Sequence, residues 1–299
     1  MAVREDGTAV SCGNGAPKVN KWKDAVAVVS GNFYDVRTYG KASYYGTVFG
    51  LQSDGTVILG DQDKIKQISE EGWTDIVSIV HGEPYLYGLR SDGTVVCYKQ
   101  TKGNQSWNQQ DEAVYLEKIA ALRDVVKIHC IADWNSTTLW IWTADGTVYK
   151  DFEPYEDQSV IAVESGSYGT AMLKKDGTVT FDLNTDLDKQ SQAEAQSMAE
   201  DINTWTDVVS MDGIAMGLKA DGTVVGVEYK NTLSKWTDIV AVYYGSSVFG
   251  LKSDGTLVSY GSNMRKDLRR GTEEWTGIRL PADRDALLAD IDLDYITGE

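Results

Sequence analysis

The residues of this chain that could perform chemistry are few or widely scattered. Neither of its two histidines, His81 and His129, has cysteines or carboxylates at the spacing of metal ligands. No nucleophile elbow, phosphate-binding loop or dinucleotide fingerprint occurs in the sequence. Two catalytic carboxylates can be close in the folded protein and far apart in the sequence. The 45 acidic residues therefore do not identify a catalytic pair. We therefore expect a protein that is not an enzyme and that binds no metal ion and no cofactor.

Regularly repeated aspartates raise the question of calcium binding. The tripeptide Asp-Gly-Thr occurs seven times between apolar stretches, where a hairpin turn favours Asp for local reasons, so we expect no calcium there. The segment Asp290-Ile-Asp-Leu-Asp294 begins like an EF-hand loop, but Tyr295 stands where that loop needs Gly. The seven tripeptides begin at Asp6, Asp54, Asp92, Asp145, Asp176, Asp221 and Asp254.

Aromatic residues in long insertions are better candidates for binding. Three segments, at about 31–45, 99–121 and 182–204, are extra relative to the shortest repeats, and the third has helix-forming composition. Tyr and Trp supply contact area at low entropic cost and dominate protein interfaces. The alternative is that these rings pack their own loops onto the domain. The predicted binding residues are Phe33, Tyr34, Tyr39, Tyr44, Tyr45, Trp107 and Tyr115.

The elements that must position these residues come from one repeated unit. A Trp-x-Asp motif starts a run with Val and Ile at alternate positions, as in Trp73-Thr-Asp-Ile-Val-Ser-Ile-Val-His-Gly82, and the run predicts a first strand. A second strand, the Asp-Gly-Thr turn and a third strand follow, and a fourth strand or a plain return segment leads to the next unit. Asp-Gly between apolar runs predicts a two-residue type I′ turn with positive φ at both residues.

One tryptophan at the same position of most units predicts packing between units, not a ligand site. These residues are Trp22, Trp73, Trp205, Trp236 and Trp275, and Leu122 replaces Trp in one unit. Antiparallel strands place the start of all three insertions on one rim, opposite the Asp-Gly-Thr turns.

Successive turns lie 31 to 53 residues apart, which is typical of a propeller or a solenoid of all-β units. Residues Ala2–Val10 form a hairpin without a first strand, and Trp275–Leu280 form a first strand without a hairpin. Closing the ring would remove both exposed edges. We predict an all-β, seven-bladed β-propeller over residues 1–280, closed by pairing of the N- and C-terminal strands, with 281–299 as an acidic tail.

This pattern resembles the regulator of chromosome condensation repeat in its short bacterial form. The matching residues are Trp-x-Asp-Ile-Val, a Gly, and Gly-Leu-Lys-x-Asp-Gly-Thr-Val, repeated over residues 1–280. The resemblance implies a seven-bladed propeller. The eukaryotic stretch Gly-x-Asn-x-x-Gly-Gln-Leu-Gly is missing, apart from Gly261-Ser-Asn263, so guanine-nucleotide exchange is not implied. The chain is also similar in plan to a secreted bacterial inhibitor of β-lactamases, which offers protein–protein inhibition as a model.

The composition limits the classes of partner that this chain is expected to bind. A net charge of −17 argues against nucleic acid, because phosphate binding needs clustered Lys and Arg. The one basic cluster, Arg265-Lys266 with Arg269-Arg270, is expected to be a solvated loop, with a docking patch for an acidic partner as the alternative. We expect a protein partner recognised through the aromatic rim, with a carbohydrate as the alternative.

Three cysteines, Cys12, Cys97 and Cys130, are too few for a disulfide framework and are expected to be buried free thiols. No stretch has transmembrane length, and no signal peptide is recognised, although a leader could precede Met1. Few Lys and many Tyr, Trp and Gly are compatible with an extracellular or surface protein of a bacterium.

Overall fold

Antiparallel sheets make up most of the structure. The computed structural model describes residues 1–12, 19–37, 41–59, 66–67, 73–82, 84–99, 109–133, 136–214, 216–245, 247–261, 272 and 274–281. Within them the strands form seven antiparallel sheets, the number that a prediction of seven blades requires. The basic cluster at 265–270 and the predicted acidic tail, apart from Pro281, lie outside the described residues.

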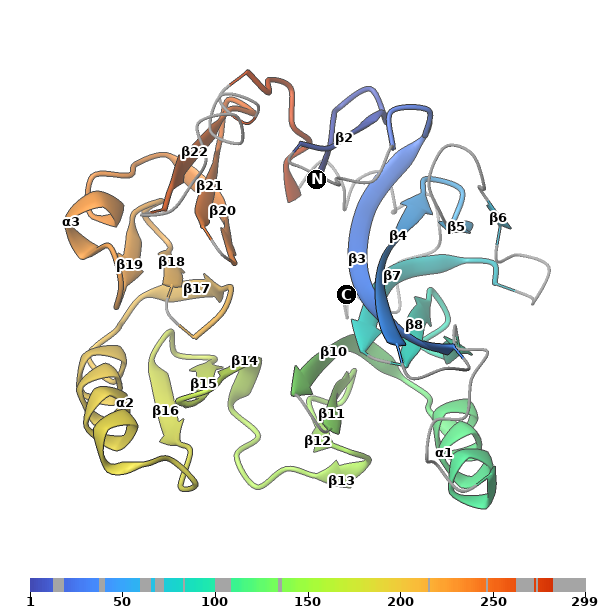
Figure 1. The fold of residues 1–299 in the computed structure, drawn as a ribbon, viewed down its shortest axis with the longest axis horizontal. Coiled ribbons are helices and arrows are strands. Elements are labelled where there is room, and N and C mark those ends of the chain that lie inside the picture. Colours follow the sequence, from blue (N-terminus) through green and yellow to red (C-terminus); the bar gives the residue numbers. More distant parts are fainter. Residues whose placement is uncertain are drawn as a thin grey trace. The chain divides into compact units, whose positions relative to one another are not determined.

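The chain divides into two units, and the first comprises Met1–Glu156 together with Ala282–Glu299. Its four sheets follow one another along the chain (Figure 1). They are β1 (Ala2–Val3) with β2 (Ala9–Val10); β3 (Ala25–Arg37), β4 (Lys41–Gln52), β5 (Val57–Leu59) and β6 (Lys66–Gln67); β7 (Ile76–Gly82), β8 (Tyr85–Arg90) and β9 (Val95–Lys99); and β10 (Val125–Asp133), β11 (Ser136–Thr143), β12 (Val148–Lys150) and β13 (Glu153–Pro154).

The second unit, Asp157–Pro281, has three sheets of three strands each. In every one the strands lie in chain order, so the predicted succession of first strand, second strand, turn and third strand is confirmed. The sheets are β14 (Val160–Gly166), β15 (Gly169–Lys174) and β16 (Val179–Leu183); β17 (Val208–Met211), β18 (Met216–Lys219) and β19 (Val224–Gly226); and β20 (Ile239–Tyr244), β21 (Val248–Lys252) and β22 (Leu257–Tyr260).

The position after the third strand is filled by either a strand or a helix. Strands β6 and β13 pair with β5 and β12, whereas helices α1 (Gln109–Ala121), α2 (Lys189–Ile202) and α3 (Lys230–Leu233) pack against β9, β16 and β19. Asp188 caps α2 by accepting the N–H groups of Gln190 and Ser191, which confirms the helix predicted in the third insertion. None of the helices in the described part is long and apolar enough to cross a membrane.

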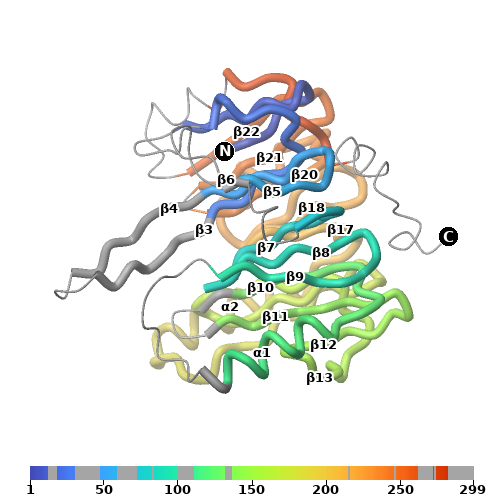
Figure 2. The backbone as a smooth tube through the Cα atoms, turned by 90° about the vertical axis from the view of Figure 1, so that its right-hand side faces the viewer, coloured from blue at the N-terminus to red at the C-terminus, as the bar shows by residue number. Residues whose placement is uncertain are grey.

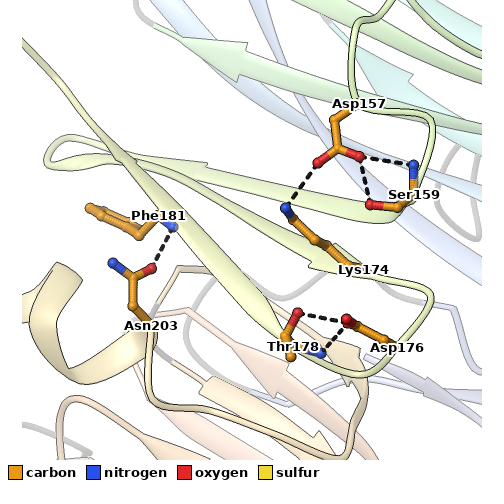
Figure 3. Close-up of polar contacts among 7 residues, drawn as sticks. All are labelled: Asp157, Ser159, Lys174, Asp176, Thr178, Phe181 and Asn203. Carbon is orange, nitrogen blue, oxygen red and sulfur yellow. Dashed lines mark hydrogen bonds and ion pairs between the residues drawn. The ribbon is translucent and has the colours of Figure 1, made fainter.

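The Asp-Gly-Thr turn differs from the predicted type I′ turn. Gly55 N–H donates to the Gln52 carbonyl (3.0 Å), and Gln52 N–H donates to the Thr56 carbonyl (2.9 Å). Of the tripeptide, Gly alone has positive φ, +77° at Gly55, so the loop is a type I turn followed by a left-handed Gly. The Asp carboxylate accepts both the N–H and the hydroxyl of Thr, as Figure 3 shows for Asp176 and Thr178. The prediction was wrong because this local bond holds Asp in a right-handed turn conformation.

Left-handed aspartates occur instead in the Trp-x-Asp motif. Asp24, Asp75, Asp124, Asp207 and Asp238 all have φ between +55° and +62°. Gly277 has the same conformation, with φ of +61°, in the otherwise equivalent segment Trp275-Thr-Gly277. Asp tolerates this region better than most residues and Gly tolerates it best, which explains the residue types at this position.

These two motifs form one contact that joins a turn to the segment that follows it, and it is found after six of the seven Asp-Gly-Thr turns. The carbonyl of the turn glycine accepts the N–H of the residue after the left-handed position, at 3.0 or 3.1 Å. A Cβ atom on Gly7 would lie 2.9 Å from the Cα of Asp24, so the two backbones touch only because the turn residue is Gly. The donor and acceptor pairs are Ala25 and Gly7, Ile76 and Gly55, Val125 and Gly93, Val208 and Gly177, Ile239 and Gly222, and Ile278 and Gly255.

The repeated tryptophans are buried, as predicted for packing residues: Trp22 is 1% exposed and Trp275 is 9% exposed. Each of the four earlier rings lies on a glycine of the second strand of its own sheet. A Cβ on Gly50 would approach the Trp22 ring to 2.6 Å, and one on Gly88 would approach the Trp73 ring to 2.7 Å. The glycine in the repeat therefore makes room for the tryptophan.

Two sheets lack the tryptophan, and both fill the glycine position with a larger residue. In the β10–β13 sheet, Leu122 stands in place of the tryptophan and Ile141 in place of the glycine. In the β14–β16 sheet, Asp157 stands in place of the tryptophan and Met172 in place of the glycine. Asp157 accepts hydrogen bonds from Ser159 and pairs with Lys174 (2.9 Å) (Figure 3). Bonds from Ser159 and Lys174 lower the pKa of Asp157 to about 2. Trp and Gly thus vary together within this one chain.

Candidate functional site

Four of the predicted binding residues lie on one hairpin. Phe33 and Tyr34 belong to β3, and Tyr44 and Tyr45 belong to β4. Tyr115 lies on α1, away from these strands in sequence. Tyr39 and Trp107 lie outside the described residues.

The β3–β4 hairpin extends well beyond its sheet. Twelve residue pairs join the two strands, from Ala25 opposite Gln52 to Arg37 opposite Lys41. Strand β5 pairs with β4 only between Phe49 and Leu51, so the remainder is a two-stranded ribbon.

The register of this ribbon places its aromatic residues opposite one another in pairs. Phe33 lies opposite Tyr45, and Tyr34 lies opposite Tyr44. Directly opposed residues of antiparallel strands have their Cβ atoms about 5 Å apart, so these positions form two aromatic pairs. Because successive residues of a strand alternate between its faces, the two pairs lie on opposite faces of the ribbon.

The first insertion was expected to be a loop, and this was wrong. Its backbone is β3 and β4 on both sides of residues 38–40. The physical reason is composition, because Phe, Tyr, Val and Thr fit a pleated strand better than a loop. The signal was present in the sequence as two runs rich in such residues.

Tyr115 holds α1 against the β7–β9 sheet, whose strands are visible in Figure 2. Its hydroxyl shares a hydrogen bond with that of Tyr87 (2.5 Å), and its ring stacks on Tyr85 with centroids 5.5 Å apart. Phe152 meets the same ring edge-on at 5.5 Å. These contacts are the packing considered above as the alternative for Tyr115, and its part in binding stays a prediction.

A carboxylate completes this helix contact. Glu112, on the first turn of α1, accepts a hydrogen bond from the Tyr85 hydroxyl (2.9 Å) and pairs with Lys99. Burial, more than any nearby charge, raises the pKa of Tyr85, Tyr87 and Tyr115. The three phenols therefore stay neutral at physiological pH and serve as hydrogen-bonding rings.

The thiols beside this cluster are also unreactive. Cys12, Cys97 and Cys130 are thiols that form no disulfide, as predicted, but each is partly exposed and not fully buried as expected. Burial raises the pKa of the Cys97 thiol to about 11, and it raises the pKa of Cys130 further. Because the thiolate is the nucleophile, neither side chain is activated for catalysis.

Both histidines are held neutral. Burial, aided by the Lys127 charge, lowers the pKa of His129 to about 4, and burial lowers that of His81. Among the described residues, His, Cys, Asp and Glu form no group of three or more that could hold a metal ion.

Asp212 is a perturbed carboxyl group that sequence reasoning missed. It lies five residues after Asp207, at the place that Val29 and Val80 occupy after Asp24 and Asp75. Burial raises its pKa to about 6, although the Tyr244 N–H donates a hydrogen bond to the carboxylate. Aligning the repeats gives Val29, Val80, His129, Glu164 and Tyr243 at this position, so the sequence alone does not mark Asp212, whose pKa is raised by its burial.

Comparisons with known proteins give similarity to solved structures alone. No protein-family model and no curated protein matches the chain. It is similar to Prp20p from Saccharomyces cerevisiae, studied for binding Gsp1p and histones, with 14% identity, a TM-score of 0.36 and coverage of 79% of this chain and 62% of Prp20p. A structure of Kap60 bound to yeast RCC1 (Prp20) gives 14% identity, a TM-score of 0.36, and coverage of 79% and 60%.

A third similar structure is BamB from Moraxella catarrhalis, with 10% identity, a TM-score of 0.41 and coverage of 89% of this chain and 85% of BamB. The chain covers 62% of the length of yeast Prp20p, which is less than two thirds. The resemblance to the regulator of chromosome condensation repeat stays a prediction. What the chain binds must be argued from its own geometry.

The raised pKa of Asp212 predicts a pH-dependent stability. Between the ordinary value of 3.8 and about 6, the unfolded state ionises first, so stability falls as pH rises through this range. Asp212→Asn should raise the free energy of unfolding at pH 7 by on the order of 1 kcal/mol and change it little at pH 4. Urea unfolding at both pH values, with exposed Asp186→Asn as the control, checks this; parallel pH profiles for wild type and Asp212→Asn would contradict it.

Proposed function

We propose that the chain is a non-enzymatic recognition module that binds a partner protein through the β3–β4 ribbon. The observation that carries the proposal is the register beyond the sheet, which places Phe33 opposite Tyr45 and Tyr34 opposite Tyr44. Paired aromatic residues on a projecting element are typical of the anchors of protein interfaces. Asp35, Arg37 and Lys41 follow toward the ribbon tip and offer both signs of charge to a partner.

The backbone of the ribbon supports the same proposal. Between Lys41 and Val48, β4 has no partner other than β3 among the described residues, and β3 pairs only with β4. Exposed strand edges of this kind can pair with an extended segment of another protein. In the three larger sheets of the first unit, the edge of the third strand is covered, β5 by β6, β9 by α1 and β12 by β13.

The test replaces Phe33, Tyr34, Tyr44 and Tyr45 together by Ala. Proteins cross-linked to the wild-type chain in its native cell extract should be lost from the variant by about tenfold or more, because several interface anchors disappear at once. Quantitative mass spectrometry of the captured proteins measures this loss.

The matched control is Val209→Ala, which trims an apolar residue that is 52% exposed in the second unit. The control should capture the same partner as the wild type, and all variants should unfold at the same temperature. Undiminished capture by the quadruple variant would refute the ribbon. Binding on a glycan array, lost in the same variant, would favour the carbohydrate alternative.

We also propose that the chain closes as a seven-bladed propeller. Trp275-Thr-Gly277 matches the segment that precedes a first strand elsewhere in the repeat, and β1 and β2 pair as a hairpin without a first strand among the described residues. In the repeat, the residue that meets the tryptophan ring lies four positions before the Asp of the turn. For Trp275 the turn would be the one at Asp6, so the residue would be Ala2. The four other tryptophans meet glycine there, and the sheets without tryptophan have Ile141 or Met172. A small residue at position 2 suits a tryptophan partner.

Closure predicts a clash that a second substitution relieves. Ala2→Ile should destabilise the chain by about 1–3 kcal/mol through overpacking against Trp275, and Trp275→Leu should recover part of this loss. The matched cycle is Gly88→Ile with Trp73→Leu, where a Cβ already lies 2.7 Å from the ring. Double-mutant cycles by urea unfolding measure both couplings. If the control cycle showed coupling while the substitutions at residues 2 and 275 had additive effects, closure through this contact would be excluded.

A further inference from the structure

A second surface in the second unit combines tyrosine rings with carboxylates. Its tyrosines and Glu228 lie at or just beyond strand ends opposite the Asp-Gly-Thr turns, Glu194 lies on α2, and we name this surface the tyrosine–carboxylate rim. Its residues come from the β14–β15 turn, α2, the segment after β19, and the ends of β20 and β22. The rim comprises Tyr168, Glu194, Glu228, Tyr229, Tyr244 and Tyr260.

Direct contacts order these side chains. The Tyr168 hydroxyl donates a hydrogen bond to Glu194 (2.7 Å), and the Tyr229 ring meets the Tyr260 ring edge-on with centroids 5.2 Å apart. A Cβ on Gly213 would lie 2.5 Å from the Tyr244 ring, so glycine makes room for that ring between two sheets. The tyrosines are therefore held in place by their surroundings, which lowers the entropic cost of binding through them.

Glu228 links the two ends of the rim electrostatically. Its charge contributes to the raised pKa of Tyr168, whose main cause is the bond to Glu194, and to that of Tyr244, whose main cause is burial. Among the described residues, no ion pair involves Glu194 or Glu228, whereas Lys230 is paired with Asp201. The negative charge of the rim is thus not neutralised by a neighbouring lysine in this part of the chain.

Exposed apolar surface adjoins these charges. Leu183 is 40% exposed and lies opposite Gly169, beside Tyr168, and Tyr243 is 47% exposed beside Tyr244. Large apolar residues next to carboxylates suit a ligand with an apolar stem and a cationic head. Lys and Arg side chains have this form, and their heads bind both carboxylates and the faces of tyrosine rings.

We propose that the tyrosine–carboxylate rim binds an extended Lys- and Arg-containing segment of a partner protein. The rim draws on all three sheets of the unit, so it fits a chain segment better than one isolated cation. The chain's net charge of −17 would steer such a segment toward it. This surface is separate from the β3–β4 ribbon, and either can fail without the other.

The experiment titrates the full chain with a fluorescent peptide of alternating Arg and Ser, measured by anisotropy at low and physiological ionic strength. Glu228→Gln and Tyr260→Leu should each weaken binding by about fivefold or more, because each removes a carboxylate or an aromatic contact with the cation. Tyr260→Phe keeps the ring, and Glu117→Gln removes an exposed charge from α1 in the first unit. Both controls should change the dissociation constant by less than about twofold.

Four results would overturn the proposal, and the first three concern the peptide. They are no binding of the peptide, equal weakening by Glu117→Gln and Glu228→Gln, and unchanged binding by Tyr260→Leu. Spermine that binds as tightly as the peptide would also overturn it, because the site would then recognise charge without an extended chain. Shortening the ribbon, by joining Gly31 to Thr47 through an Asn-Gly turn, should leave peptide binding intact.

Discussion

The structure depends on one backbone contact, in which the carbonyl of a turn glycine accepts the N–H that begins the next sheet. The contact needs a left-handed Gly on one side and a left-handed Asp, or Gly277, on the other. Side chains cannot intervene, because a Cβ on Gly7 or Gly55 would lie within 3.0 Å of the facing backbone. The most regular features of the sequence, Asp-Gly-Thr and Trp-x-Asp, are therefore the two sides of a single joint.

Once the sheets are joined in this way, the remaining positions are free to vary. After the third strand the chain forms β6, β13, α1, α2 or α3, and each packs on or pairs with the same edge of its sheet. The first connection can be a tight turn, as between β14 and β15, or the long β3–β4 ribbon. Both surfaces proposed to bind partners belong to these variable parts, which a fixed scaffold can present without loss of its own contacts.

Most features that recur along the chain could be predicted from the sequence. The strand order, the burial of the tryptophans and the helix at Lys189–Ile202 followed from motifs or composition. The turn type did not, because the conformation of Asp is decided by its bond to Thr two residues later. Helix α1 was missed because Tyr115 and Glu112 are held by Tyr87, Tyr85 and Lys99 of another element.

Unrepeated features were the hardest to predict. The ribbon has no counterpart elsewhere in the chain, so its residues were interpreted as a loop although they favour strands. Asp212 differs from Val29 and Val80 at the same position, and its raised pKa depends on burial that a sequence does not display. Of the predicted binding residues, the register sets four opposite one another as two pairs, and the packing of Tyr115 depends on tertiary contacts.

Hydrogen exchange tests the joint between sheets most directly. The N–H groups of Ala25, Ile76, Val125, Val208 and Ile239 donate to turn glycines, whereas the N–H groups of Thr56 and Thr94 donate to exposed carboxylates in the same turns. If the joint holds the sheets together, the first set should exchange only through unfolding of neighbouring sheets and much more slowly than the threonines. Exchange of both sets at similar rates would contradict the account.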